Sequence, residues 1–183
     1  MRRFQTPFKL PLFSVFLLFA GSRFACAQGS LPLPSDVPTG LAVPADLPLV
    51  LITHASGSQI YTCQAGADGK LAWTLKAPDA ELRDASGKVI GHHGAGPSWL
   101  LNDGSKVTGK AAAHADSPDP DSIPWLLVNV VSHDGNGVIA KVTTIQRLHT
   151  RGGKAPATGC DGSRKDAETK SSYTADYYFY ATK

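Results

Sequence analysis

Between residues 49 and 181, short apolar stretches alternate with clusters of Gly, Asp, Asn and Ser. Within residues 57–63 (GSQIYTC), side chains alternate between the two faces of a predicted strand. The clusters at 84–87 (DASG) and 102–105 (NDGS) each lie between two apolar runs, which predicts two β-hairpins. The pattern therefore predicts an all-β domain of about seven to nine mostly antiparallel strands with long loops, folded as a β-sandwich or a partly open β-barrel.

Three segments refine this prediction. Residues 125–131 (WLLVNVV) place apolar side chains on both faces, which predicts a strand that is covered on both sides. Aromatic side chains also alternate in residues 173–180 (YTADYYFY), with Tyr173, Tyr177 and Phe179 on one face and Tyr178 and Tyr180 on the other. One face is expected in the core, and the other is expected to be available for stacking on a sugar or a partner. Residues 110–122 (KAAAHADSPDPDS) predict a loop, because their prolines end any helical turn begun by the alanines.

The first 27 residues have a different pattern. A basic start precedes a short apolar run at residues 10–21, and the small side chains of Ala25 and Ala27 follow it. This layout predicts a secretory signal peptide that is cut after Ala27, and hence a secreted or periplasmic protein. A membrane-spanning helix needs roughly 20 apolar residues, so no membrane span is expected.

Composition supports the division of the chain. Five prolines in residues 28–48 predict an extended arm with polyproline character, followed by a single β domain at residues 49–183. Four of the 18 basic residues and none of the 15 acidic ones lie in the first 27 residues, so the rest carries 14 basic and 15 acidic side chains. With this nearly neutral balance, net charge gives no support for a nucleic-acid partner, and none is expected. Thirteen of the acids are Asp and two are Glu, which favours turns over helices.

The cysteines indicate an oxidising destination. Cleavage after Ala27 removes Cys26 and leaves Cys63 and Cys160. An even number of cysteines in an exported protein favours a disulfide, and two buried free thiols are the alternative. A bridge that closes such a long loop stabilises the folded chain by about 4–5 kcal/mol in the chain-entropy model.

Eight short segments resemble a known family and follow one another in its order. They are 57–63 (GSQIYTC), 96–99 (GPSW) leading into 103–105 (DGS), 123–126 (IPWL), 144–147 (TIQR), 150–153 (TRGG), 159–161 (GCD) and 173–177 (YTADY). Together they are similar to the domain-of-unknown-function family numbered 3455, over nearly all of residues 40–181. The resemblance implies an exported β-rich domain, and it carries no established activity, ligand or catalytic residue.

Histidines are the main candidates for metal chemistry. His92, His93, His133 and Asp134 lie at predicted hairpin ends, where loops bring distant residues together. They are candidate ligands for a divalent metal, although neighbouring residues of a strand point to opposite faces and no diagnostic metal spacing occurs. A metal-binding protein or metal-dependent enzyme is therefore the alternative hypothesis.

The leading hypothesis is an exported, non-catalytic domain that binds a glycan or a protein of the cell envelope or the medium. No Gly-x-Ser-x-Gly nucleophile turn is present, and no paired carboxylates suggest a hydrolase. Trp99 follows Gly96 and Pro97 in a turn-rich stretch, so we expect its ring to be exposed. Trp99, His93 and His133 are the candidate ligand-binding residues.

Overall fold

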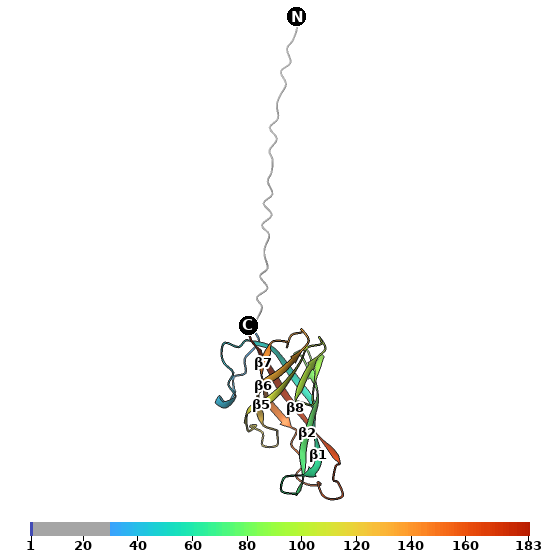
Figure 1. Ribbon diagram of the computed structural model, residues 1–183. Helices are drawn as coiled ribbons and strands as arrows, with labels where there is room; N and C mark the ends of the chain where they lie inside the picture. Colours follow the sequence, from blue (N-terminus) through green and yellow to red (C-terminus); the bar gives the residue numbers. More distant parts are fainter. Residues whose placement is uncertain (2–29) are drawn as a thin grey trace. The chain divides into compact units, whose positions relative to one another are not determined.

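Eight antiparallel strands close into a barrel in the computed structural model (Figure 1). The structure describes Met1 and residues 30–183, so the predicted signal peptide lies, apart from Met1, outside the described residues. Each strand pairs with its neighbours in the chain, and β1 also pairs with β8. The elements are η1 (Thr39–Leu41), a 3-10 turn, and the strands β1 (Leu49–Ala65), β2 (Leu71–Arg83), β3 (Val89–Gly94), β4 (Ser98–Leu101), β5 (Lys106–Ala115), β6 (Trp125–Asp134), β7 (Val142–Gly152) and β8 (Glu168–Ala181).

The predicted all-β, antiparallel fold is confirmed, and of the two predicted architectures the chain adopts the barrel. Both predicted hairpins are present, between β2 and β3 and between β4 and β5. In β1 the strand runs unbroken through Gly57, where a Cβ atom would lie 2.2 Å from the carbonyl oxygen of Asp79 in β2. Only glycine permits this close approach of the two backbones.

The prediction of a loop over residues 110–122 is wrong for its first part, because β5 continues to Ala115. Pairing with β6 outweighs the weak helical preference of the alanines. The register shifts between Ala111 and Ala113, so that Ala111 lines the barrel interior whereas Ala113 and Ala115 pack against the outer cluster. A β-bulge of this kind turns the following side chains to the opposite face.

The interior of the barrel holds the main apolar cluster. In β8 the inward side chains alternate along the strand, and Tyr173, Ala175, Tyr177 and Phe179 are all buried. The strand predicted to be covered on both sides is covered in its first part, where Val128 of β6 packs inside and its neighbour Leu127 packs outside. The prediction is wrong for its end, because Val131 is 64% exposed.

A second apolar cluster lies on the outer face of the barrel, under residues 31–48. Leu41 of η1 is fully buried there with Trp125 of β6 and with Tyr178 and Tyr180 of β8. Both faces of β8 are therefore covered, and neither tyrosine ring is available for stacking on a sugar. The proline-rich arm makes this possible, because prolines bring no N–H groups that must be satisfied when the segment packs on the sheet.

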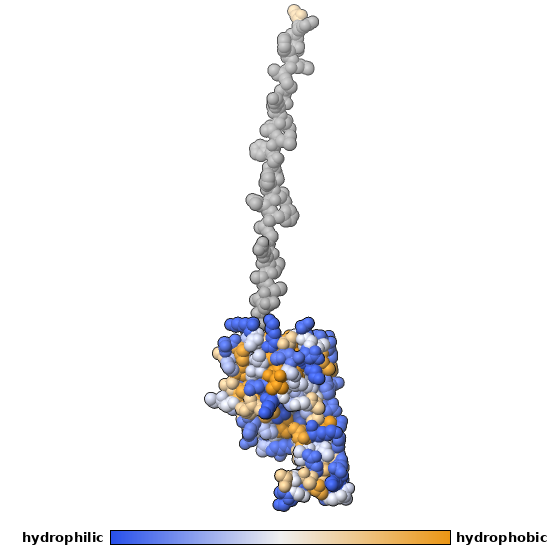
Figure 2. All heavy atoms as spheres, viewed as in Figure 1, coloured by the Kyte–Doolittle hydropathy of each residue, from blue (hydrophilic) through white to orange (hydrophobic). Residues whose placement is uncertain are grey.

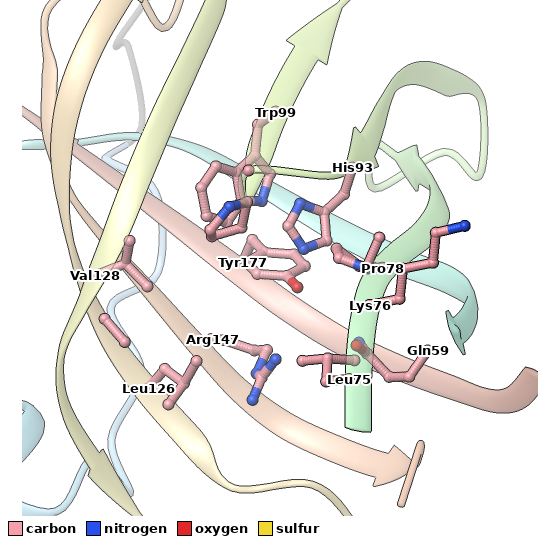
Figure 3. Close-up of a pocket in the computed structure, with 14 residues that line it drawn as sticks. Gln59, Leu75, Lys76, Pro78, His93, Trp99, Leu126, Val128, Arg147 and Tyr177 are labelled. Atoms are coloured by element: carbon pink, nitrogen blue, oxygen red, sulfur yellow. The ribbon is translucent and has the colours of Figure 1, made fainter. Parts of the chain in front are cut away.

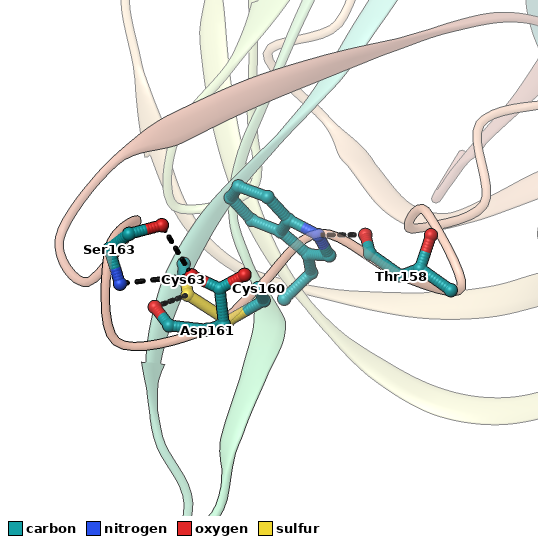
Figure 4. Close-up of a disulfide and its surroundings, with 6 residues drawn as sticks. Cys63, Thr158, Cys160, Asp161 and Ser163 are labelled. Atoms are coloured by element: carbon teal, nitrogen blue, oxygen red, sulfur yellow. Dashed lines mark hydrogen bonds between the residues drawn. A yellow bond between two sulfur atoms is a disulfide. The ribbon is translucent and has the colours of Figure 1, made fainter.

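A disulfide joins Cys63 in β1 to Cys160 in the loop before β8, as predicted (Figure 4). The Cα atoms lie 5.3 Å apart, and the bridge spans 97 positions of sequence. Beside it, the indole Nε1 of Trp73 donates a hydrogen bond to the carbonyl oxygen of Thr158 at 2.9 Å. The long loop is thus held to the β1–β2 pair at two points. Within the described residues, no helix is long and apolar enough to cross a membrane.

Candidate ligand-binding site

A cavity of about 330 Å³ lies inside the barrel (Figure 3). Every strand contributes at least one lining residue, which places the cavity on the axis of the barrel. In order from β1 to β8, these residues include Gln59, Pro78, His93, Trp99, Ala111, Val128, Arg147 and Tyr177. The volume is within the range of about 300–1,000 Å³ that is usual for small-molecule sites.

Three aromatic rings form one wall of the cavity. His93 and Trp99 are direct partners across β3 and β4, and their rings stack with centroids 4.5 Å apart and an angle of 17° between the planes. Tyr177 completes the wall, with its ring centroid 5.0 Å from that of His93. Gly109 of β5 makes room, because a Cβ there would lie 2.4 Å from Val128 and close to the indole of Trp99.

The prediction that Trp99 is exposed is wrong, since only 1% of the residue is accessible. The short strand β4 places Trp99 toward the interior and its neighbour Leu100 outward, in the alternation that any strand imposes. Trp99 nevertheless lines the cavity together with His93, so two of the three predicted ligand-binding residues meet there.

His93 is a neutral ring inside the barrel. Burial lowers its pKa to about 3, and the positive charges of Arg147 and His92 act in the same direction. Its Nδ1 donates a hydrogen bond to the carbonyl oxygen of Ser98 at 2.8 Å. The neutral imidazole therefore carries its proton on Nδ1, and Nε2 remains a hydrogen-bond acceptor.

Arg147 of β7 supplies the positive charge of the cavity. It is the direct cross-strand partner of Tyr177, and the two side chains share the inner face of the barrel. The guanidinium Nη2 donates to the carbonyl oxygen of Pro124 at 2.8 Å, whereas the buried Nε has no partner. Among the described residues, no carboxylate forms an ion pair with Arg147.

Other polar atoms of the interior are also without partners. The Nε2 of Gln59, the Nε1 of Trp99 and the hydroxyl of Tyr177 are buried and form no hydrogen bond within the described chain. Figure 3 shows the guanidinium of Arg147 and the hydroxyl of Tyr177 directed into the same space. Burial raises the pKa of Tyr177, and the side chains of Arg147 and Tyr173 oppose that rise without cancelling it, so the hydroxyl stays protonated and can donate. The site thus offers several donors among apolar walls.

The predicted metal ligands are not brought together. His92 points outward, where its Nε2 donates to a carboxylate oxygen of Asp79 at 2.9 Å, while His93 lies inside. His133 is three strands away from His93 in the sheet, about 14 Å at the usual strand spacing.

His133 instead donates from Nε2 to the carbonyl oxygen of Val142 at 2.6 Å. Asp134, the next residue, is exposed and is paired in the sheet with Lys106 of β5. In the part of the chain that the structure describes, no group of three or more metal-binding side chains lies close enough to hold an ion.

Gln59, Arg147 and Tyr177 were not predicted from the sequence as site residues. One signal was present for Arg147, because it falls on the face of β7 that also carries the buried Ile145, a position where a charge is unusual. Gln59 is also a polar residue on a buried face, because it shares one face of β1 with the buried Tyr61 and Cys63. A polar residue on the inner face of an apolar strand is the pattern that identifies this site.

Comparison with known proteins gives one match. The family model described as "Protein of unknown function (DUF3455)" matches residues 44–181, which include the whole cavity. No curated protein and no solved structure matches the chain.

Proposed function

Because the chain belongs to the DUF3455 family of proteins of unknown function, we propose from its geometry that it is an exported, non-catalytic binding protein that takes a small ligand into the barrel. One observation carries this proposal: every strand presents a residue to one cavity whose buried donors lack partners. Each buried, unsatisfied polar group costs about 1–3 kcal/mol of stability. A bound ligand that accepts hydrogen bonds from these groups would remove that cost.

The rest of the molecule supports export and an interior site. The disulfide suits an oxidising compartment and agrees with the predicted signal peptide. On the face shown in Figure 2, hydrophobic residues are scattered among hydrophilic ones and do not form one continuous patch. Most aromatic rings suited to stacking on a glycan are buried under the arm or inside the barrel, and the partly exposed Trp73 is engaged beside the disulfide by its hydrogen bond to Thr158. A small molecule held inside is therefore better supported than a surface-bound glycan or protein.

A matched pair of alanine variants tests the proposal. Ala111 and Ala112 are both exposed neighbours in β5, but Ala111 lines the cavity and Ala112 does not. We expect the neutral fluorescent reporter N-phenyl-1-naphthylamine to bind the full chain, and Ala111→Trp to weaken that binding at least about tenfold by filling the cavity. Ala112→Trp should bind as the unaltered chain does. No binding to the unaltered chain, or equal affinity in both variants, would contradict an interior site.

A further inference from the structure

We infer that the ligand is a monocarboxylate with an apolar body, and that Arg147 binds its carboxylate. This inference rests on the proposed function and specifies the ligand of the same cavity. It follows from the charges that line the cavity, from the donors that surround Arg147 and from the character of the remaining walls.

The charge balance of the cavity selects an anion. Arg147 and Lys76 are its charged lining residues, and no Asp or Glu lines it. Lys76 already forms an ion pair with Glu168 and is exposed. Arg147 is half-buried, with its Nε fully buried, and it is left as the charge without a counter-ion among the described residues. Removing part of a cation from water is costly unless an anion accompanies it. A positively charged ligand would add to this cost.

The donors around Arg147 match a carboxylate. A guanidinium presents its N–H groups as a planar fork that fits the two oxygens of a carboxylate. Among the described residues, its Nη2 donates to the carbonyl oxygen of Pro124, and its buried Nε has no partner. Tyr177 lies directly across the strand pair, and the unpartnered Nε2 of Gln59 lines the same cavity. A single carboxylate has enough lone pairs to accept from all three side chains.

The other walls fit a hydrocarbon body better than a sugar or a phosphate ester. Leu126 and Val128 of β6, Pro78 of β2 and the indole ring of Trp99 are apolar surfaces. Leu75 of β2 also lines the cavity and is 53% exposed, so apolar surface continues toward solvent. A phosphate carries more charge and usually requires several basic groups or a helix N-terminus.

The experiment is isothermal titration calorimetry of the full chain with two matched probe pairs. They are trans-cinnamate with cinnamamide and octanoate with octanamide, in which an amide replaces the carboxylate on an unchanged body. We expect at least one carboxylate to bind about tenfold or more tightly than its amide. Arg147→Met should abolish that preference and leave amide binding within about threefold. Arg151→Met is the control, because Arg151 is an exposed arginine of the same strand.

The outcomes separate this inference from the proposed function. Equal affinity for acid and amide would overturn the carboxylate while leaving an interior site intact, as would a preference that survives in Arg147→Met. Failure of all four probes together with the neutral reporter would contradict both. If Arg147→Met does not fold, as judged by circular dichroism, Gln59→Leu takes its place. It should weaken carboxylate binding more than amide binding, and an equal effect on both would count against the inference.

Discussion

The inner and outer faces of the barrel wall differ in whether their buried polar side chains have hydrogen-bond partners. Under the arm, the Tyr180 hydroxyl donates to Oε1 of Gln146 at 2.8 Å, and Nε2 of the same glutamine donates to the carbonyl oxygen of Leu41 at 2.6 Å. Arg147 and Tyr177 are the next residue pair of the same two strands, β7 and β8, and point inside the barrel. Their Nε and hydroxyl have no hydrogen-bond partner within the described chain. One buried atom under the arm, Nε1 of Trp125, also has no partner among the described residues and is an exception to this difference.

This difference separates groups that hold the structure from groups available to a ligand. Outside, polar atoms link the arm to β7 and β8, and removal of either partner leaves a buried group unsatisfied. Inside the barrel, several buried polar atoms form no hydrogen bond within the described chain. Outer-face variants should therefore lose stability, whereas interior variants should lose binding at a smaller cost in stability.

The largest expected effect concerns the arm. Leu41→Ala should lower the free energy of unfolding by about 2–5 kcal/mol, because Leu41 is fully buried between the arm and the sheet. Leu33→Ala, in the same arm but at a position 68% exposed, should have little effect. Chemical denaturation of both variants measures this, and equal stability of the two would show that the arm does not stabilise the barrel.

The next effect is a pH dependence that originates inside the barrel. The pKa of His93 is about 3 when folded, so below pH 6.5 the unfolded chain binds a proton that the folded chain does not. The free energy of unfolding should therefore fall by about 2 kcal/mol between pH 6.5 and pH 4.5 through this group. His93→Gln should remove that part of the loss, as measured by denaturation at both pH values. An unchanged loss in the variant would contradict the assignment.

Other titrating groups act mainly outside this window. For His149 burial opposes the charged form, but the hydrogen bonds that its ring donates to Asp176 and Asp36 outweigh burial and raise the pKa. Its stabilising contribution is therefore complete below its unfolded pKa and is lost as the pH rises through the folded value. Hydrogen bonds lower the pKa of Asp36 and Asp79, so their contribution is lost only as the pH falls below about 4.

The smallest expected change in stability comes from removing one tyrosine hydroxyl on each face, which compares the two faces directly. Tyr180→Phe should cost about 1–3 kcal/mol, because it leaves Oε1 of Gln146 buried without its donor. Tyr177→Phe removes a hydroxyl that has no partner within the described chain, so stability should be unchanged or slightly higher. Thermal unfolding of the two variants compares them. A larger loss in Tyr177→Phe would reverse the proposed division of roles.

The sequence predicts local features better than the closure of the sheet. Turn residues at 84–87 and 102–105 specify hairpins through short-range backbone preferences, and both form. The exposure of Trp99 and of one aromatic face of β8, the face that carries Tyr178 and Tyr180, was misjudged because it depends on distant segments. The first points into a closed barrel, and the other two lie under an arm more than 100 positions away in the chain. The unpaired state of Arg147 likewise depends on which groups all eight strands present to the interior.

A crystal structure of the full chain grown with trans-cinnamate or octanoate, whichever binds more tightly, tests the interior carboxylate site most directly. We expect density for the probe inside the barrel, with its carboxylate accepting hydrogen bonds from Arg147 and its apolar body against Trp99 and Val128. Ordered waters that satisfy Gln59, Arg147 and Tyr177, with the probe absent from the interior or bound elsewhere, would contradict this expectation.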